Sequence, residues 1–388
     1  MRLLHVINSI NPVGGGPIEG LRQLDVYLAQ RGVDVQICCN DAPDAPYVVN
    51  SGLDVIATGP ARLRYGFNMR LLRWLREHGH EYEVIIVHGI WQFHSLATWL
   101  ALRPQRTPYY VFTHGMLDPW FKHRYPLKHL KKALYWAVGD YWVLRDARAV
   151  LFTAEEERLR ARESFGLYQC REKVTTFGTS PPPANRQAMH AAFTQAFPAT
   201  AGRRNLLFLG RVHEKKGVDL LMQGFASVAS TDPSLHLIMA GPCEVPLRHQ
   251  LEAIAQRAGV SDRVTWTGML QGDLKWGAFE AADVFCLPSH QENFGVAVAE
   301  SLGCGVPVMI SNKVNIWREI EGDGAGLICD DTAADTERAL RQWIATPAAE
   351  RTLMRQRALE CFEQRFQSSR FAERLLDIVG APGAVAQV

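Results

Sequence analysis

The sequence predicts an α/β protein made of two doubly wound domains, each with a parallel sheet. Short apolar runs rich in Val, Ile and Leu alternate with longer stretches of helical periodicity, which is typical of repeated β-α units. This alternation occurs twice along the 388 residues, a length that suits two domains. Together, the two observations favour a pair of similar domains over one large sheet.

The expected strands are short and are followed by polar residues or glycine. In the first half they cover residues 2–8, 33–39, 83–89, 109–115 and 149–154, and in the second half residues 205–211, 235–241, 263–268, 284–289, 307–311 and 325–330. Helices are expected between them. One covers residues 18–32 and ends at Gly32, and another covers residues 295–305 and ends at Gly303 or Gly305.

Proline and glycine mark the domain boundaries. Pro181 to Pro183, Pro198 and Gly202 interrupt any regular element. Residues 181–204 are therefore expected to form a linker between a first domain (1–180) and a second domain (205–365). Residues 366–388 are expected to form a final helix and a tail.

Composition excludes several classes of protein. The formal net charge of +2 and the pI near 8.1 give no chain-wide attraction for nucleic acid. The eight cysteines include no Cys-x-x-Cys pair, which indicates reduced thiols in the cytoplasm. The N-terminal stretch is too polar for a signal peptide, and no run of eighteen apolar residues occurs. The protein is expected in the cytoplasm, or at most on the inner face of the cell membrane.

Two segments that follow first strands suit anions. In doubly wound domains ligands bind at the carboxyl ends of the strands, and two such domains are expected to share a central cleft. In "INPVGGGPIEG" the glycines let the backbone approach a ligand at a helix N-terminus, although a tight turn explains them as well. In "FLGRVHEKKG", Arg211, Lys215 and Lys216 suit a diphosphate. The alternative there is a solvated basic helix start, which opposes the helix dipole.

Two glutamates flank the start of the helix expected over residues 295–305. Glu292 lies in the preceding loop and Glu300 about two turns into the helix. The loop amides of Asn293, Phe294 and Gly295 are expected to point to the same cleft. A carboxylate can grip vicinal hydroxyls, so one acid suits a ribose and the other a hexose. The alternative is that neither glutamate binds a ligand: one carboxylate interacts favourably with the helix dipole at the N-terminus, and the other lies on the surface.

The segments "GGGPIEG", "LGRVHEKKG" and "HQENFGVAVAESLGCGVPV" together resemble the family 4 retaining glycosyltransferases of the GT-B fold. The signature of that family is a glutamate, seven residues and a second glutamate, here Glu292 to Glu300. The three segments occur in the family's order and span nearly the whole chain. The resemblance implies two Rossmann-like domains facing a central cleft, a first domain that binds the acceptor, and a final helix that crosses back to it.

The resemblance also implies roles for the residues quoted above. Arg211 and Lys216 neutralise the diphosphate, and Glu300 holds the nucleotide ribose. Glu292, with the amides of residues 293–295, holds the donor sugar. Catalysis is thereby assigned to Arg211, Lys216 and Glu292, together with a histidine described below.

Further donor contacts are implied for Gly15 and Gly16, near the phosphate or the acceptor, and for Met269 and Leu270, beside the base. No Asp-x-Asp sequence occurs anywhere in the chain. Because fixed cations can stabilise a leaving diphosphate in place of a metal, no metal and no cofactor other than the donor substrate are expected.

The first domain offers candidate residues at two strand ends. His114, in "VFTHGMLD", resembles the family's active-site histidine, which lies against the donor sugar; the alternative is a structural histidine. His88, in "IIVHGIW", ends the preceding strand, and Trp91 is a surface on which a sugar can stack. Both are acceptor candidates.

A basic segment lies between Asp118 and Asp140, where no acid occurs. Leu127, Leu130, Leu134, Val138 and Tyr141 recur at helical spacing, so one face is expected in the core and the other is cationic. One interpretation is a solvated helix face. The other is contact with an anionic membrane surface or a polyprenyl-diphosphate acceptor, through Lys128, Lys131 and Lys132.

These observations predict a retaining, metal-independent hexosyltransferase. It is expected to move a sugar from a UDP or GDP sugar to a lipid-linked glycan acceptor in surface polysaccharide synthesis. Two alternatives remain open. A sugar-nucleotide 2-epimerase of similar architecture would turn over the donor without an acceptor, and a non-catalytic sugar-nucleotide binding protein would bind the donor without turnover.

Overall fold

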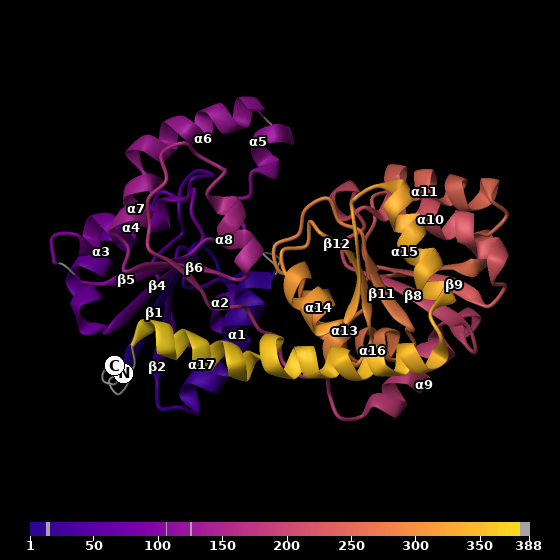
Figure 1. Cartoon of the computed structure of the whole chain (residues 1–388). Coiled ribbons are helices and arrows are strands. Elements are labelled where there is room, and N and C mark those ends of the chain that lie inside the picture. The colour runs from indigo at the N-terminus through magenta and orange to yellow at the C-terminus, as the bar shows by residue number, and fades with distance from the viewer. Residues whose placement is uncertain (13–15, 106, 125, 381–388) are drawn as a thin grey trace. The chain divides into compact units, whose positions relative to one another are not determined.

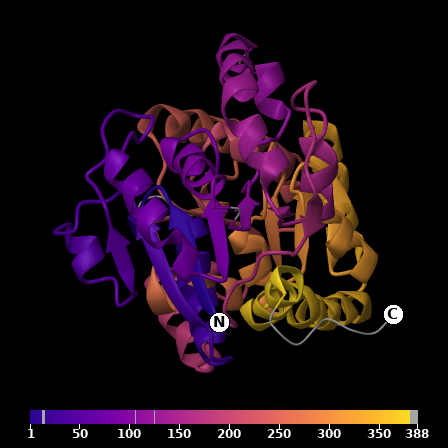
Figure 2. The same ribbon diagram turned by 90° about the vertical axis from the view of Figure 1, so that its left-hand side faces the viewer.

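The computed structural model describes residues 1–12, 16–105, 107–124 and 126–380. The chain divides into two compact units (Figures 1 and 2). The first unit comprises Met1–Gly178 and Ser368–Val388, and the second comprises Thr179–Gln367. Each unit has one sheet with helices packed around it, so the expected pair of α/β domains is confirmed.

The first unit has a seven-stranded parallel sheet of order β3-β2-β1-β4-β5-β6-β7. Its strands are β1 (Arg2–Ile7), β2 (Asp34–Cys39), β3 (Val55–Ala57), β4 (Val84–His88), β5 (Tyr109–Phe112), β6 (Ala149–Phe152) and β7 (Glu172–Val174). The five predicted strands are confirmed. The sequence analysis missed β3 and β7, because each has only three residues and no run of buried side chains.

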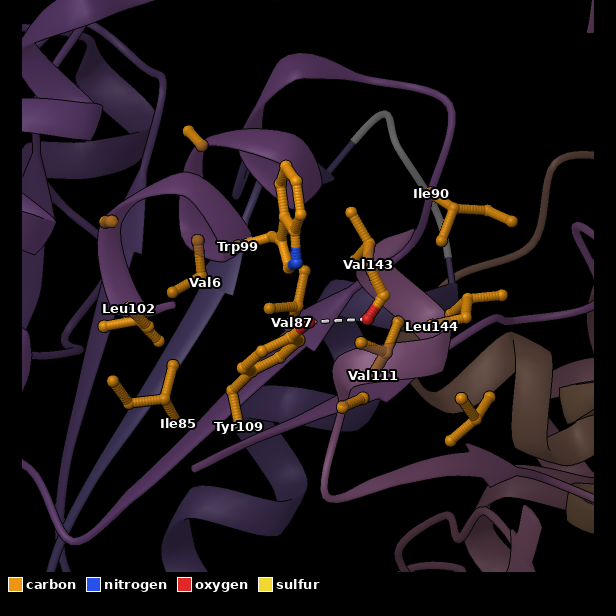
Figure 3. Close-up of a cluster of buried hydrophobic side chains, with 14 of the residues drawn as sticks. Val6, Ile85, Val87, Ile90, Trp99, Leu102, Tyr109, Val111, Val143 and Leu144 are labelled. Carbon is orange, nitrogen blue, oxygen red and sulfur yellow. Dashed lines mark hydrogen bonds between the residues drawn. The ribbon is translucent and has the colours of Figure 1, made fainter. Parts of the chain in front are cut away.

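Helices surround this sheet. They are α1 (Gly16–Ala29), α2 (Pro46–Val49), α3 (Met69–His78), η2 (Gly79–Glu81), α4 (Phe93–Leu102), α5 (Trp120–Arg124), α6 (Pro126–Val138), α7 (Asp140–Asp146), α8 (Glu155–Ala161) and α17 (Ser368–Val379). Figure 3 shows the core between β4, β5, α4 and α7. Within it the Tyr109 hydroxyl donates to Val143 O at 2.6 Å, so the one polar atom of that ring is satisfied.

The last helix, α17, belongs to the first unit although it follows the second in sequence. The ring of Phe371 packs against Phe177 and, edge-on, against Phe112, with centroid distances of 5.4 and 6.0 Å. Arg31, which follows α1, forms an ion pair of 2.8 Å with Glu373 of α17. The expected return of the final helix to the first domain is confirmed.

The second unit has a six-stranded parallel sheet of order β10-β9-β8-β11-β12-β13. Its strands are β8 (Arg204–Leu209), β9 (Leu235–Ala240), β10 (Val264–Gly268), β11 (Val284–Leu287), β12 (Val308–Ser311) and β13 (Gly326–Cys329). All six were predicted. The strand order reverses between β8 and β11, as it does between β1 and β4 in the first unit.

The helices of the second unit include two in the segment expected to be a linker, residues 181–204. They are α9 (Arg186–Ala196), η3 (Pro198–Thr200), η4 (Glu214–Lys216), α10 (Val218–Val228), η5 (Ala229–Thr231), α11 (Val245–Arg257), η6 (Ser261–Arg263), α12 (Gly272–Glu280), α13 (Val296–Gly303), α14 (Trp317–Asp323), α15 (Ala333–Ala345), α16 (Ala348–Cys361) and η7 (Phe362–Phe366). The linker prediction is wrong because α9 packs closely on α12. A Cβ on Gly277 would lie 2.2 Å from Met189 O, and Phe193 is fully buried.

Candidate functional site

The loop that follows β8 carries Arg211 and Lys216. The amides of Gly210 and Val212 each donate, at 2.9 Å, to a carbonyl at the end of β9 or in the loop after it, which fixes the path of the backbone. The side chain of Arg211 is exposed, and Lys216 ends η4. The predicted cationic loop therefore forms at the reversal of strand order, where doubly wound sheets bind ligands.

Gly217 brings this loop into backbone contact with the loop that follows β11. Its φ is 63°, and a Cβ would lie 1.9 Å from Pro288 O, so no side chain fits. Lys215 O accepts hydrogen bonds from His290 N and from Ser289 Oγ, both at 2.9 Å. The two loops thus form one surface, held together by main-chain contacts.

Lys216 and Glu292 meet on this surface as an ion pair between Nζ and Oε2. Their side chains are 25% and 18% exposed, so the pair is largely desolvated and still open to a ligand. Burial, together with the charges of Lys215 and Arg211, lowers the pKa of Lys216 to about 8. Crowded cations of this kind favour an additional anion such as a diphosphate.

The backbone of Glu292 is held by the loop that follows β12. Its amide donates to Lys313 O, and its carbonyl accepts from Asn315 N, both at 3.0 Å. Asn315 Nδ2 also donates to Asn293 Oδ1 at 3.1 Å. These bonds fix Glu292 and Asn293 at the start of α13.

Phe294 and Gly295 complete this loop in different ways. Phe294 is 5% exposed and its ring packs against Phe366, so its side chain belongs to the core. Gly295 has φ 72°, and a Cβ there would lie 3.3 Å from Glu292 Cγ. A glycine at this position therefore leaves room beside the Glu292 carboxylate.

Glu300 lies on α13, as predicted, and is paired with a residue that the sequence analysis missed. Lys275 of α12 contacts it, with 2.5 Å between Nζ and Oε1. The side chain of Glu300 is 8% exposed and that of Lys275 is 25% exposed. No sequence pattern indicates Lys275, because it lies on another helix, 25 residues from Glu300 in sequence.

The expected base-binding residues lie just before α12. Met269 is 69% exposed, and Leu270 is half-buried. They follow β10 and precede the helix that carries Lys275. The second unit therefore brings the proposed base, ribose and diphosphate contacts to the carboxyl ends of β8, β10 and β11.

In the first unit, His114 follows β5 in a left-handed backbone conformation, with φ 48°. A buried carboxylate holds its neighbours: Glu157 Oε1 accepts from Thr113 Oγ1 at 2.8 Å and from Gly115 N at 2.6 Å. The other oxygen, Oε2, accepts from the amide and hydroxyl of Thr153, both at 2.7 Å. Glu157, which the sequence analysis also missed, thus fixes the loop that presents His114.

His88 has a different environment from the one expected of an acceptor contact. It is 5% exposed, and its ring nitrogens face His5 and His114 at 2.8 and 3.0 Å. Because both nitrogens are engaged and the ring is covered, His88 does not present a polar atom to an acceptor. A signal for this was available in the sequence, since His5 interrupts an apolar strand.

Trp91 and Lys132 form one cluster in the first unit. Lys132 Nζ lies 4.5 Å from the Trp91 ring centroid, so this residue points away from the exposed cationic face to which it was assigned. The amide of Trp91 donates to the buried Asp140 at 2.7 Å, and burial raises the pKa of that carboxyl to about 6. Because Lys132 lies over the indole, that part of the expected sugar-stacking surface is already covered.

Helix α6 presents its apolar residues to solvent, contrary to the expected core face. Leu127, Leu130, Leu134 and Val138 are 79%, 62%, 70% and 74% exposed. Tyr141 is buried, but it belongs to α7. The error arose because helical spacing identifies an apolar face without identifying what covers it. Lys128 and Lys131 are exposed, as expected.

The glycine-rich turn of the first unit is partly outside the described residues. Gly15 lies among residues 13–15, which are not described, and Gly16 begins α1. The helix N-terminus expected at this point is therefore present.

The arrangement suits chemistry on a sugar diphosphate. Fixed cations stabilise negative charge that grows on a leaving group, and the Glu300 carboxylate can accept from two vicinal hydroxyls. Within the part of the chain that the structure describes, no group of three His, Cys, Asp or Glu side chains gathers to hold a metal.

Comparisons with known proteins match both units. A model of group 1 glycosyl transferases matches residues 191–360, and a model of glycosyl transferase 4-like domains matches residues 15–178. The chain is 31% identical over 162 residues to a D-inositol 3-phosphate glycosyltransferase of Arthrobacter sp. (strain FB24), a match that covers 41% of this chain and 38% of the relative. It is 30% identical over 131 residues to the mannosylfructose-phosphate synthase of Agrobacterium fabrum (strain C58), covering 32% of this chain and 29% of that protein. These matches span well under half the length of either relative.

Solved structures resemble the whole chain. The sucrose-phosphate synthase of Thermosynechococcus elongatus has a TM-score of 0.72 at 20% identity, covering 97% of both chains. Anabaena Alr3699/HepE in complex with UDP and glucose has a TM-score of 0.73 at 17% identity, covering 97% of this chain and 98% of that one. WaaG, a glycosyltransferase involved in lipopolysaccharide biosynthesis, has a TM-score of 0.67 at 16% identity, covering 98% and 100%. With both units matched by family models and the whole fold shared, the chain belongs to the family 4 glycosyltransferases of the GT-B fold.

Proposed function

We propose that the protein is a retaining, metal-independent hexosyltransferase. In this proposal it moves a hexose from a UDP or GDP sugar to a glycan carried on a polyprenyl diphosphate, in surface polysaccharide synthesis. The observation that supports it most is the Lys216–Glu292 pair beside Arg211, at the reversal of strand order in the second unit. The HepE structure, which holds UDP and glucose, supports the same class of donor.

In the proposed reaction the bond between the anomeric carbon and the phosphate oxygen breaks, and its electron pair goes to the diphosphate. Arg211 and Lys216 stabilise the charge that grows there. An acceptor hydroxyl forms the new bond to the anomeric carbon on the same face of the ring, and its proton passes to the departing phosphate oxygen. Glu292 holds the hexose through its hydroxyls, and Glu300 holds the ribose.

A donor screen followed by a transfer assay tests this proposal. Thermal unfolding is measured with UDP, GDP and ADP and their hexose conjugates, because a ligand at 100 times its Kd adds about 2.7 kcal/mol of stability. Transfer from the stabilising donor is then followed in excess EDTA, and NMR of the product is expected to show the donor's anomeric configuration.

Three outcomes contradict different parts of the proposal. Activity that returns only with added magnesium or manganese contradicts the metal-independent reaction. Conversion of the donor without an acceptor indicates an epimerase, and binding of the donor without any turnover indicates a non-catalytic binding protein.

Nucleoside diphosphate binding is expected to take up close to one proton at pH 9 and almost none at pH 7. The pKa of Lys216 is about 8 in the free protein, so at pH 9 most of these side chains must gain a proton to pair with a phosphate. Affinity is therefore expected to fall as the pH rises through 8. Titration calorimetry in buffers of different ionisation enthalpy measures the uptake directly.

Lys216→Arg is the matched variant for this measurement, because a guanidinium keeps its charge up to about pH 12. It is expected to bind without taking up a proton at pH 9. If Lys216→Arg takes up the same number of protons as the wild type, another group is responsible and the role of Lys216 is contradicted.

The membrane part of the proposal rests on α6. The stripe formed by Leu127, Leu130, Leu134 and Val138 is exposed along a helix of 13 residues, about 20 Å long. Exposed cations lie beside it at Lys128 and Lys131 on α6, and at Lys122 and Arg124 on α5. No helix among the described residues is long and apolar enough to span a bilayer. An apolar stripe flanked by cations fits the headgroup boundary of an anionic bilayer.

The wild type is expected to sediment with vesicles of anionic phospholipid at low salt and to be released at high salt. Each basic residue near such a surface contributes about 1 kcal/mol, which salt screens. Changing both Lys128 and Lys131 to Glu is expected to abolish sedimentation. Changing Leu127, Leu130 and Leu134 to Gln is expected to weaken it at all salt concentrations, because it removes the apolar contact. Lys132 is left unchanged because it packs on Trp91.

The matched control changes Arg73 and Arg76 to Glu, which reverses two exposed charges on α3 of the same unit. Sedimentation of this control is expected to match the wild type. If all variants sediment equally, the stripe is not a membrane contact. If the leucine variant instead changes only the oligomeric state, the stripe binds another copy of the chain.

A further inference from the structure

Three histidines of the first unit form a hydrogen-bonded chain from the core to the end of β5. His5 Nδ1 lies 2.8 Å from His88 Nε2, and His88 Nδ1 lies 3.0 Å from His114 Nε2. Burial lowers the pKa of His5 to about 3 and of His114 to about 4, and it holds the pKa of His88 well below its usual value. All three imidazoles are therefore neutral at pH 7.

A neutral imidazole carries one N–H. The hydrogens of the three hydrogen-bonded histidines therefore have only two possible arrangements. In the outward arrangement, His5 Nδ1–H donates to His88 and His88 Nδ1–H donates to His114. His114 then carries its own hydrogen on Nδ1. In the inward arrangement both bonds are reversed, His114 donates through Nε2, and its Nδ1 is bare.

The inner end of the chain distinguishes the two arrangements. His5 Nε2 is buried and has no hydrogen-bond partner among the described residues. The inward arrangement places a hydrogen on this nitrogen, and orphaned buried N–H groups are rarer than orphaned acceptors. The outward arrangement leaves only a bare nitrogen there.

The same core contains a second bare nitrogen whose state is fixed. His94 Nε2 lies 2.9 Å from His88 O, and because a carbonyl only accepts, Nε2 of His94 carries the hydrogen. Its Nδ1 is therefore bare, and it is buried without a partner among the described residues. The core around His88 thus already contains one bare, buried nitrogen without a hydrogen-bond partner, which is the state that the outward arrangement requires of His5 Nε2.

We infer that His5 and His88 are positioning residues that hold His114 as the Nδ1–H tautomer, so that His114 donates a hydrogen bond to an oxygen of a sugar substrate. This inference rests on the proposed sugar transfer. Because Nδ1 already carries a hydrogen, His114 does not take the proton of the acceptor hydroxyl. Glu157 supports the same role by accepting from the Thr113 hydroxyl and the Gly115 amide, on either side of His114.

Two variants of His88 that are nearly equal in size test the inference. His88→Asp places an acceptor beside His114, which draws the hydrogen of His114 onto Nε2. His88→Asn keeps a donor at that point through its amide group. We expect His88→Asp to lower kcat about 100-fold, as for the loss of one transition-state donor, with the Kd for nucleoside diphosphate unchanged. The conservative His88→Asn is expected to recover most of this loss.

NMR of protein labelled with ¹⁵N-histidine gives a readout that a purely structural role would not change. The wild type is expected to show a pyrrole-like Nδ1 and a pyridine-like Nε2 at His114, with the signals assigned by their loss in His114→Gln. In His88→Asp the hydrogen is expected on Nε2.

Two results overturn the inference. One is a pyrrole-like Nε2 at His114 in the wild type. The other is an equal loss of kcat in both His88 variants with the His114 tautomer unchanged. If His88→Asp does not fold, the wild-type spectrum still decides. If no donor supports sugar transfer, the proposed function fails separately, since the tautomer is measured without substrate.

Discussion

Replacing Arg211 or Lys216 with alanine is expected to lower turnover at saturating donor by about 100-fold or more, because both cations face charge that increases in the transition state. The side chain of Arg211 is exposed, so its removal is expected to leave the stability of the fold unchanged. Initial rates at saturating donor and acceptor measure the effect. Thermal unfolding of the same samples shows whether the protein stays folded.

Two further variants identify the cause of the loss. Arg257→Ala removes an exposed cation from α11 of the same unit and is expected to keep wild-type turnover. Lys216→Ala also leaves the Glu292 carboxylate without its partner. If the loss comes only from that stranded charge, Lys216→Ala combined with Glu292→Gln, which removes the charge and keeps hydrogen-bonding atoms for the hexose, recovers activity, and the role of Lys216 at the diphosphate is wrong. Near-normal turnover of Arg211→Ala would contradict its role in the same way.

Glu300→Ala is expected to raise the Kd of the nucleoside diphosphate by about 10-fold to 100-fold, since hydrogen bonds to charged groups contribute about 1.5–3 kcal/mol. The reason is the loss of the acceptor for the ribose hydroxyls, so kcat at saturating donor is expected to fall much less. Titration calorimetry with UDP or GDP measures the change.

The matched control is Glu280→Ala. Glu280 lies on α12, as Lys275 does, and the change removes its ion pair of 2.6 Å with Arg186. It is expected to lower thermal stability without changing the Kd. Lys275→Ala keeps the Glu300 carboxylate and is expected to raise the Kd less than Glu300→Ala does. An unchanged Kd in Glu300→Ala would remove this residue from the ribose site.

The sequence predicted the strands and their order in the chain, because the buried parallel strands are continuous apolar runs. It did not predict β3 and β7, whose three residues bury too little surface to give a pattern. It also missed α9 by expecting a linker over residues 181–204, since the prolines at 181–183 and at 198 lie on either side of the helix rather than within it. Proline marks an interruption without indicating what lies beyond it.

The same limit applies to the candidate site. The loops that carry Arg211 and Glu292 could be predicted because residues near the ends of adjacent parallel strands share one edge of a sheet. Lys275 and Glu157 could not, because Lys275 meets Glu300 across 25 residues of sequence and Glu157 meets Gly115 across 42, and only the folded structure brings these residues together. The stripe on α6 was identified by its spacing, but its exposure depends on what packs against the helix, which the spacing does not encode.

The place of α17 in the first unit also bears on how the chain folds during its synthesis. The segment Thr179–Gln367 separates α17 from the rest of that unit. At about 5–20 residues per second, a ribosome takes about ten to forty seconds to make this segment. During that time Phe112 and Phe177 lack the partner that Phe371 later provides, so an apolar surface stays open on the nascent first unit. The second unit is continuous in sequence and has no such delay, so it is the one that can complete its core first, even though it is synthesised second.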